Sequence, residues 1–544
     1  MLKGIKKILN LSSGSSQKKN QNPDQTHYQD FVSTNVSEHI ERNREVIKKA
    51  LGNSPDIIYR DLSIGLTGIQ ALVVYIEGLV DMAAIAGNVI KTLTLETVYA
   101  DSANFRHLTI DIIKEQIITV GDVIEENSIE LVLKYLLSGH TLIFVQGAET
   151  ALIVSALSSS SLRSVEEPAT EAVIRGAREG FVESLGTNRV LLRRKLRSPI
   201  LRFEETTVGS VSQTPVSVVY LDGIADKKLI DEVNKRIERI KIDGILESGY
   251  IEEFIHDAPF SPFPTVRTTE RPDVVAANLL EGRAAILVDG TPIAMIVPAT
   301  FVQFLQASED YYQSFQYVFA IRLLRYLSFF ITLFLPSVYI AVTTFHQEML
   351  PSALALSIAA SRQGIPFPAF IEALMMETAF EVLREAGVRL PRPIGQSVSI
   401  VGALVIGDAA VRAGIVSPAM VIIVSGTAIA SFTMPGYTFG IAIRLMRFPI
   451  MVLSAALGLF GLMMGGFILF VHMASLRSFG SPYLAPIAPA FWRGQKDVFV
   501  RAPWWAMFTR PVDTGHLNQN RVPPGQKPEN PQNKQGGYAK RGKR

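Results

Sequence analysis

The sequence predicts a duplicated α/β soluble region followed by a polytopic helical membrane bundle. Charged residues crowd the N-terminal part and the C-terminal tail of the 544-residue chain but are scarce between Tyr326 and Ala474. An apolar stretch of membrane-spanning length opens this charge-poor region, and two blocks of the charged part repeat. The expected boundaries are a disordered N-terminal tail at 1–34, α/β subdomains at 55–160 and 206–305, a charged helical connector at 161–205, a transmembrane bundle of four to six segments at 320–475, and a hydrophilic basic C-terminal tail at 476–544.

The membrane region is expected to begin near residue 320. A bilayer core of about 30 Å requires roughly 20 apolar residues in a helix, and the run from Tyr326 to Phe345 meets this requirement. Further hydrophobic runs follow at Met349–Ala360, Ile394–Val411, Ile415–Thr433 and Pro449–Ala474. Earlier apolar runs are short, rich in Val and Ile and bounded by glycine, so they are interpreted as buried strands.

Lysine and arginine residues near the spans predict the orientation of the chain. Arg322 and Arg325 place the N-terminal region in the cytoplasm, and the basic tail places the C-terminal region there as well. Two cytoplasmic ends require an even number of crossings, whereas five runs are present. Treating Met349–Ala360 as a re-entrant segment would put Arg384, Arg389 and Arg392 outside, against the rule, so the number of crossings stays open.

Two blocks of the soluble region repeat in the same order. VVYIEGLVD at Val73–Asp81 matches VVYLDGIAD at Val218–Asp226, and GHTLIFVQGAETALIVSA at Gly139–Ala156 matches GRAAILVDGTPIAMIVPA at Gly282–Ala299. Each copy is expected to contain a strand, a helix capped by an Asp, a variable stretch, a helix ending before a glycine, and a hairpin. This mixture predicts two α/β subdomains.

The connector between the copies is densely charged. It is interpreted either as a solvated helix with internal ion pairs or as a basic surface that contacts anionic membrane lipids or a neighbouring subunit. The candidate residues for the second interpretation are Arg175, Arg178, Arg189, Arg193 and Arg194.

Acidic residues within the predicted membrane region are candidates for an ion path, because an ionisable group there is costly and needs a reason. Glu372, Glu377, Glu381 and Glu385 lie on an amphipathic stretch, and the last three share one helical face. This face is expected either to line a water-filled conduit, as rings of glutamates in an oligomer, or to serve interfacial or ion-paired roles. Asp408 either pairs with Arg412 one turn later or faces an aqueous path.

Glycines and helix breaks in the same region indicate close packing and cavities. Gly458, Gly461 and Gly465 are expected to allow close helix–helix approach, with packing in an oligomer as one setting. Pro336, Pro351 and the Met434–Gly436 stretch are predicted to interrupt helices, which favours a cavity-lining bundle over a passive anchor.

Several function classes find no support in the residues. The absence of cysteine excludes disulfides, thiolate metal sites and cysteine nucleophiles, and the net charge of +3 does not indicate a nucleic acid partner. No phosphate-binding loop, dinucleotide fingerprint, HExxH or GxSxG motif occurs, and the eight histidines are scattered. We expect no enzyme activity, catalytic residue, metal site or cofactor.

Long motifs resemble the A subunits of GerA-type spore germinant receptors. They include EPATEAVIRGAREGFVESLGTN in the connector, SPFPTVRTTERPD at Ser261–Asp273, SEDYY at Ser308–Tyr312, and LPSVYIAVTTFHQEMLP at Leu335–Pro351. Further motifs lie at Gly364–Gln396 and Val401–Met420, and the resemblance covers roughly residues 35–500. The extended hydrophilic C-terminal tail departs from the common pattern.

The resemblance implies a multi-pass protein of the spore inner membrane or cell membrane. It would act in a nutrient-sensing germination receptor with a transporter-like B subunit and a lipoprotein C subunit, and would form a homo-oligomer that provides or gates an ion-conducting path. Two alternatives remain open: a secondary transporter subunit, which broken helices and an intramembrane acid would suit, and a membrane-anchored scaffold for a germination complex.

Overall fold

The computed structural model describes residues 34–65, 68–96, 113–114, 123–155, 167–168, 171, 173–389, 407–491, 494–511, 513–514, 517–523 and 525–528. Its contacts divide the chain into two units, and each is described by itself. Unit 1 comprises Met1–His256, Thr268–Pro298 and Ala502–Arg544, and unit 2 comprises Asp257–Arg267 and Ala299–Arg501. The predicted N-terminal tail lies outside the described residues, apart from its last residue.

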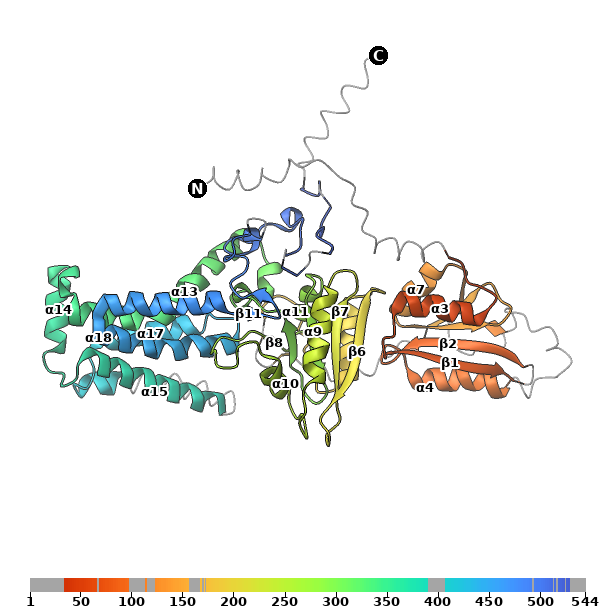
Figure 1. Ribbon diagram of the computed structural model, residues 1–544, viewed down its shortest axis with the longest axis horizontal. Coiled ribbons are helices and arrows are strands. Elements are labelled where there is room, and N and C mark those ends of the chain that lie inside the picture. Colours follow the sequence, from red (N-terminus) through yellow and green to blue (C-terminus); the bar gives the residue numbers. More distant parts are fainter. Residues whose placement is uncertain are drawn as a thin grey trace, which may run out of the picture. The chain divides into compact units, whose positions relative to one another are not determined.

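The first copy in unit 1 is a sheet covered by helices on both faces (Figure 1). Its strand order is β1-β2-β4-β5-β3, and all neighbouring strands are antiparallel. Alternate residues of each strand face opposite layers, so one face packs on α3 and α7 and the other on α4 and the π-helical turns. The elements are α3 (Ile40–Leu51), β1 (Ile57–Ile64), β2 (Ile69–Ile76), α4 (Met82–Ile85), η1 (Ala86–Ile90), η2 (Thr92–Glu96), β3 (Val123–Glu126), α7 (Ile129–Leu137), β4 (His140–Val145) and β5 (Ala151–Ser155).

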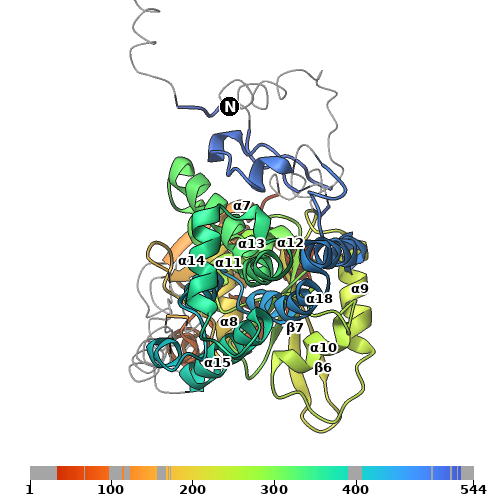
Figure 2. The same ribbon diagram turned by 90° about the vertical axis from the view of Figure 1, so that its left-hand side faces the viewer.

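The second copy repeats this topology with the strand order β6-β7-β9-β10-β8. Helices α8 and α11 pack on one face of its sheet, while α9 contacts β6 and β7 and α10 contacts α9 (Figure 2). The predicted α/β duplication, the hairpins and the Asp caps of α4 and α9 are therefore confirmed. The elements are α8 (Leu185–Lys195), β6 (Leu201–Val208), β7 (Thr214–Leu221), α9 (Lys227–Glu238), α10 (Ser248–Ile255), β8 (Arg267–Thr269), α11 (Pro272–Leu279), β9 (Ala284–Val288) and β10 (Ala294–Val297).

The duplication includes a helix in front of each first strand, which the matched sequence blocks did not reach. Asn43 of α3 exchanges two hydrogen bonds with the backbone of Ser37, and Asn188 of α8 does the same with Val182. A cation follows in each helix, with Lys48 over the Tyr59 ring at 5.4 Å and Arg193 over the Phe203 ring at 4.8 Å. The charged connector thus contributes α8 to the second copy.

A buried ion pair joins the two copies. Arg193 donates from Nε and Nη2 to the two carboxylate oxygens of Asp56 at 2.7 and 3.0 Å, and its third nitrogen donates to the Leu201 carbonyl. The side chains of Arg193 and Asp56 are 1% and 3% exposed. Phe203 also donates its backbone N–H to Ser54 Oγ. The joint is therefore dry and bidentate, the geometry in which an arginine–carboxylate pair is most directional.

Glu252 on α10 makes the stability of unit 1 depend on pH. Burial, with a smaller contribution from the charge of Glu247, raises its pKa from 4.5 to about 7. Between these values the folded chain holds a proton that the unfolded chain releases, so the free energy of unfolding falls as the pH rises through this interval, by up to about 1.4 kcal/mol per pH unit. We expect Glu252→Gln to flatten a denaturation series between pH 4.5 and 7, and the exposed Glu253→Gln to leave it unchanged.

Unit 2 is helical, and two of its helices are long and apolar enough to cross a membrane, α13 (Phe315–Phe345) and α18 (Tyr437–Ser475). The soluble α/β architecture and the helical C-terminal region agree with the predicted fold class. The remaining elements of this unit are α12 (Phe301–Phe304), η5 (Ser308–Tyr311), η6 (Gln347–Met349), α14 (Ser352–Arg362), α15 (Ala369–Arg389), α17 (Pro418–Ser431), β11 (Arg477–Ser478), β12 (Ser481–Pro482) and η7 (Gln495–Asp497); the short helix η8 (Trp504–Ala506) belongs to unit 1.

Helix α18 reverses direction at Gly458, which has φ 62° and ψ −139°. The rings of Phe439 and His472, near its two ends, both lie about 6 Å from the ring of Phe263, at 6.3 and 6.1 Å. A straight helix would separate residues so distant in sequence by about 50 Å. The helix is therefore a hairpin of two arms, 437–457 and 459–475.

Glycines allow the two arms to pack closely. A Cβ at Gly461 would collide with the carbonyl of Leu453 in the first arm, and one at Gly465 would lie 3.1 Å from the Leu453 side chain. The close approach that these glycines permit is seen here within one chain. At the turn, a Cβ on Gly458 would meet His346 at 2.8 Å.

We expect Gly461→Ala to lower the thermal stability of the detergent-solubilised protein, because the added methyl group meets backbone that cannot yield. Overpacking of this kind costs about 1–3 kcal/mol. Gly426→Ala on α17 is the matched control, since a Cβ there meets nothing within 4 Å. An equal melting temperature for both variants would contradict the close packing of the arms.

The structure differs from one expected helix break and agrees with another. Helix α13 continues through Pro336, so the prediction of an interruption there is wrong. Pro336 is buried inside the helix, where groups on packed neighbouring elements can satisfy the carbonyl that lacks its donor. The Met434–Gly436 stretch does separate α17 from α18. Most of the predicted run Ile394–Val411, together with Arg392, lies outside the described residues.

Candidate functional site: a buried charge cluster

Helices α15 and α18 bring five charged side chains together inside unit 2. Glu377 forms an ion pair with Arg447 at 2.7 Å, and both side chains are 2% exposed. Glu381 pairs with Arg444 at 3.2 Å and with Arg447 at 3.5 Å. Arg384 donates to Ser431 Oγ and stacks over the Phe432 ring. We call these residues the charge cluster: Glu377, Glu381, Arg384, Arg444 and Arg447.

The cluster lies near the middle of the helical layer. Residue numbers rise along α15 as they fall along the first arm of α18 in the pairs Glu377–Arg447 and Glu381–Arg444, so these helices are antiparallel. Arg447 stands near the midpoint of the arm 437–457, and Glu377 near the midpoint of α15. The pair is therefore about as far as it can be from either end of both helices.

The cluster does not offer free carboxylates to a cation. Three arginines accompany two glutamates, so one positive charge is in excess when all five are ionised. The acidic face of α15 is thus neutralised within a single chain, and it can attract cations only if the pairs separate.

Several buried polar atoms of the cluster and of the helices α13 and α18 have no hydrogen-bond partner among the described residues. These include Glu377 Oε1, Arg447 Nε and the hydroxyls of Ser337 and Ser454. Ser337 lies on α13 and Ser454 on the first arm of α18, two elements that pack extensively on each other. Unsatisfied buried polar groups are rare in folded proteins and mark places where water or a rearrangement completes the bonding.

The other predicted acidic residues are placed differently from one another. Glu372 is fully buried, pairs with Arg362 at 3.1 Å and accepts from the Ser417 N–H at 2.9 Å. Glu385 pairs with Arg389 on an exposed part of α15. Asp408 pairs with Arg412 at 2.8 Å, and both are exposed. The i,i+4 geometry that one interpretation of Asp408 expects is therefore present.

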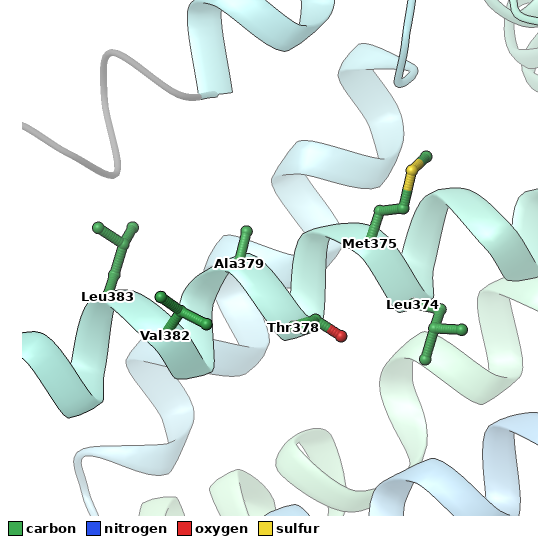
Figure 3. Close-up of a pocket in the computed structure, with 6 residues that line it drawn as sticks. All are labelled: Leu374, Met375, Thr378, Ala379, Val382 and Leu383. Carbon is green, nitrogen blue, oxygen red and sulfur yellow. The ribbon is translucent and has the colours of Figure 1, made fainter.

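The remaining faces of α15 are apolar. Figure 3 shows six side chains that line an apolar hollow along this helix. Val382 among them is 63% exposed, whereas Glu377 is buried. The lining residues are Leu374, Met375, Thr378, Ala379, Val382 and Leu383. Over residues 374–383, helix α15 therefore buries Glu377 and exposes hydrocarbon, the reverse of a helix on a water-soluble protein.

A second buried ion network ties the start of α13 to the segment after α18. Asp310 is 2% exposed and accepts two hydrogen bonds from Arg325 at 2.7 and 2.8 Å and one from Arg322 at 3.1 Å. Arg322 also pairs with Asp497 at 2.9 Å, to which Tyr311 donates its hydroxyl. The arginines that sequence reasoning used only for orientation are therefore structural as well.

The basic connector residues divide into three groups. Arg193 is committed to the buried pair with Asp56. Arg189 pairs with Glu205 at 2.6 Å. Arg175, Arg178 and Arg194 are exposed. Only this last group keeps its guanidinium at the surface as a subunit or lipid contact would require.

Sequence reasoning missed the arginines of the cluster. Arg444 and Arg447 stand in the apolar stretch IAIRLMRFPIMV, three residues apart and hence on neighbouring positions of one helical face. An arginine within a run that is otherwise uncharged was a detectable signal, because such a residue usually pairs with a carboxylate. No group of three or more metal-ligating side chains occurs among the described residues.

The sequence is similar to those of germination proteins. The Bacillus/Clostridium GerA spore germination protein family matches residues 45–513. Spore germination protein KA of Bacillus subtilis is 49% identical over 91% of this chain and 90% of its own length. Spore germination protein GerLA of Bacillus cereus is 40% identical over 86% and 93%. An uncharacterized membrane protein of Bacillus subtilis, YfkQ, is 46% identical over 92% and 95%.

Among solved structures, the chain is similar to the crystal structure of the N-terminal domain of the A subunit of the Bacillus megaterium spore germinant receptor GerK3. The identity is 38%, the match covers 50% of this chain and 99% of that domain, and the TM-score is 0.40. The family match over most of the chain and the identity to full-length relatives decide the assignment: this protein belongs to the GerA spore germination protein family.

Proposed function

We propose that this chain is the A subunit of a nutrient-sensing germinant receptor and that several copies form or gate an ion-conducting path in the membrane. Its relatives in Bacillus subtilis and Bacillus cereus are named as spore germination proteins, which supports the germination role. By family analogy the partners are a transporter-like B subunit and a lipoprotein C subunit, and the location is the spore inner membrane.

The observation that carries the membrane part of the proposal is the inverted polarity of unit 2. Glu372, Glu377 and Arg447 are buried, while large apolar side chains point outward, such as Ile422 at 72%, Phe460 at 67% and Met463 at 72% exposed. In water this arrangement would lose about 25 cal/mol for each Å² of apolar surface left uncovered. In a bilayer the same surface is solvated by lipid, and the charges must pair internally.

The helix directions support an even number of crossings. Helix α13 runs parallel to the first arm of α18, because Phe329 lies by Phe439 at one end and Phe345 lies by Gly458 at the other. The second arm of α18 runs in the opposite direction to the first. Helix α15 runs with α17, since Glu372 contacts Ser417 and Arg384 contacts Ser431. Because α13 and the second arm of α18 run in opposite directions, the chain enters and leaves this unit on the same side, which supports an even number of crossings with both ends in the cytoplasm.

On this proposal Arg384 and Arg389 lie at the cytoplasmic side, because α15 runs opposite to the first arm of α18 and to α13. The positive-inside rule is then obeyed, and the conflict created by a five-run count disappears. The exposed helix α14, which covers most of the Met349–Ala360 run, joins two crossings on the opposite side.

In the gating model, the charge cluster is closed when its pairs are made and conducting when they separate. Separation frees Glu377 and Glu381 to attract a cation and admits water to the unpaired hydroxyls of Ser337 and Ser454. Nutrient binding elsewhere in the receptor supplies the free energy by favouring the open state.

The test is ion flux from proteoliposomes or from germinating spores. We expect Glu377→Gln combined with Glu381→Gln to reduce flux strongly, and the exposed Glu385→Gln to leave it unchanged. Flux unaffected by the double substitution would remove the charge cluster from the path. Saturable counterflow of a substrate would favour a transporter instead, and the absence of both activities would favour a scaffold.

A further inference from the structure

The connector holds an exposed apolar side chain followed closely by two exposed arginines. In the loop of residues 173–179, here called the arginine loop, Ile174 is 89% exposed and Arg175 and Arg178 are exposed. The base of this loop is fixed, because buried Arg271 at the start of α11 donates to the carbonyls of Glu171 and Ala177 at 3.1 and 2.9 Å. The loop therefore presents Ile174 on a fixed support.

An exposed surface with aromatic side chains and a carboxylate lies on and just before α10. Tyr250 and Phe254 stand one turn apart and are 42% and 48% exposed, and Leu246 just before the helix is 74% exposed. Glu253 is exposed beside them. We call these four residues the α10 patch. Glu247 anchors the start of the helix by accepting from the Gly249 N–H and the Thr291 hydroxyl.

The two surfaces lie on opposite sides of the second α/β copy. The arginine loop attaches to α11, which packs with α8 on one face of the sheet. Helix α10 packs with α9 on the other face (Figure 2). An aliphatic tip with cations matches an aromatic surface with a carboxylate, yet the sheet between them keeps the two apart within one chain.

We infer that the arginine loop of one copy of this protein docks on the α10 patch of the next copy, so that the soluble units assemble head to tail. Contacts between different patches on opposite faces are heterologous, and a series of them closes into a ring when the rotation between copies allows it. Ile174 would be covered by Tyr250 and Phe254, and Arg178 would face Glu253. This inference rests on the proposed oligomerisation and names its contact surface.

Cross-linking tests the contact directly, because the 544-residue sequence contains no cysteine. The variant carrying both Ile174→Cys and Phe254→Cys, oxidised in membranes, is expected to give a ladder of covalent oligomers. Each single variant is expected to give none. The matched control pairs Ile174→Cys with Val211→Cys, which is 82% exposed in the turn between β6 and β7. A ladder equal in both double variants, or absent from the first, would overturn the contact.

A charge exchange keeps the inference testable if oxidation fails. In a detergent that weakens the contacts between membrane units, the Arg178→Glu variant is expected not to assemble. Adding Glu253→Arg to the same chain is expected to restore the assembly. The oligomeric state of the unmodified protein is measured in parallel. A stable oligomer without cross-linking or charge rescue rejects this contact alone, whereas a strict monomer rejects the proposed assembly as a whole.

Membrane lipid is the competing occupant of the arginine loop. A solvent-sensitive dye on Ile174→Cys is expected to give the same spectrum in phosphatidylcholine vesicles with and without phosphatidylglycerol. A shift that depends on the anionic lipid, together with a missing ladder, would assign the loop to the membrane surface and refute the docking between copies.

Discussion

Arg447→Met is expected to destabilise the closed form of the membrane unit and to produce ion leakage without nutrient. The substitution leaves Glu377 buried and without its partner at 2.7 Å. Removing one member of a buried pair costs about 3–5 kcal/mol, because the remaining charge is uncompensated in a poorly polarisable surrounding. Flux from proteoliposomes and thermal unfolding in detergent measure the two effects.

A double-mutant cycle separates loss of the pair from loss of packing. Glu377→Gln with Arg447→Met removes both charges, so a large part of the stability lost in the single variant should return. Leu445→Met, on the exposed side of the same arm, is the control for a change of similar size. Equal stability of the single and double variants would show that the pair is not what holds α15 against α18.

Arg193→Ala is expected to lower the free energy of unfolding of unit 1 by about 3–5 kcal/mol, since it strands the buried Asp56 carboxylate. It also removes the guanidinium that covers the Phe203 ring at 4.8 Å. Chemical denaturation followed by circular dichroism measures the loss. The effect should be larger than that of Arg189→Ala, whose partner Glu205 is 34% exposed and can be rehydrated.

The Arg193→Lys variant distinguishes the contribution of the bidentate hydrogen bonds to Asp56 from that of the positive charge alone. The bidentate contact needs the planar guanidinium, so Arg193→Lys should recover only part of the stability. Full recovery would mean that a point charge near Asp56 is sufficient, and that the two hydrogen bonds at 2.7 and 3.0 Å contribute little.

Local patterns predicted much of unit 1. The strand from Ile69 to Ile76, the capping Asp81 and the hairpin at Asp289-Gly290 depend on neighbouring residues, and these signals are strong within a short window. The upstream helices α3 and α8 were not matched, because their shared contacts involve one asparagine in each and little other identity. Their equivalence is visible only in the hydrogen bonds.

The charge cluster depends on contacts between residues far apart in sequence. The sequence identified Glu377 and Glu381 as unusual but could not show that α15 runs antiparallel to the first arm of α18, which brings Arg447 to Glu377. The reversal at Gly458 was hidden for a similar reason. The run Pro449–Ala474 has the length of one span, and only the positive φ of a single glycine divides it.

The joint in unit 1 has a further consequence for how the halves of the duplication relate. Both copies carry a cation stacked on an aromatic ring, Lys48 on Tyr59 and Arg193 on Phe203, yet only the second cation meets a carboxylate. Asp56 directly precedes the first strand of the first copy, and the residue that directly precedes the first strand of the second copy is Ile200. The two copies are thus no longer interchangeable. In a chain with the copies in reverse order, Lys48 would face Ile200, and the buried ion pair between the copies would be lost.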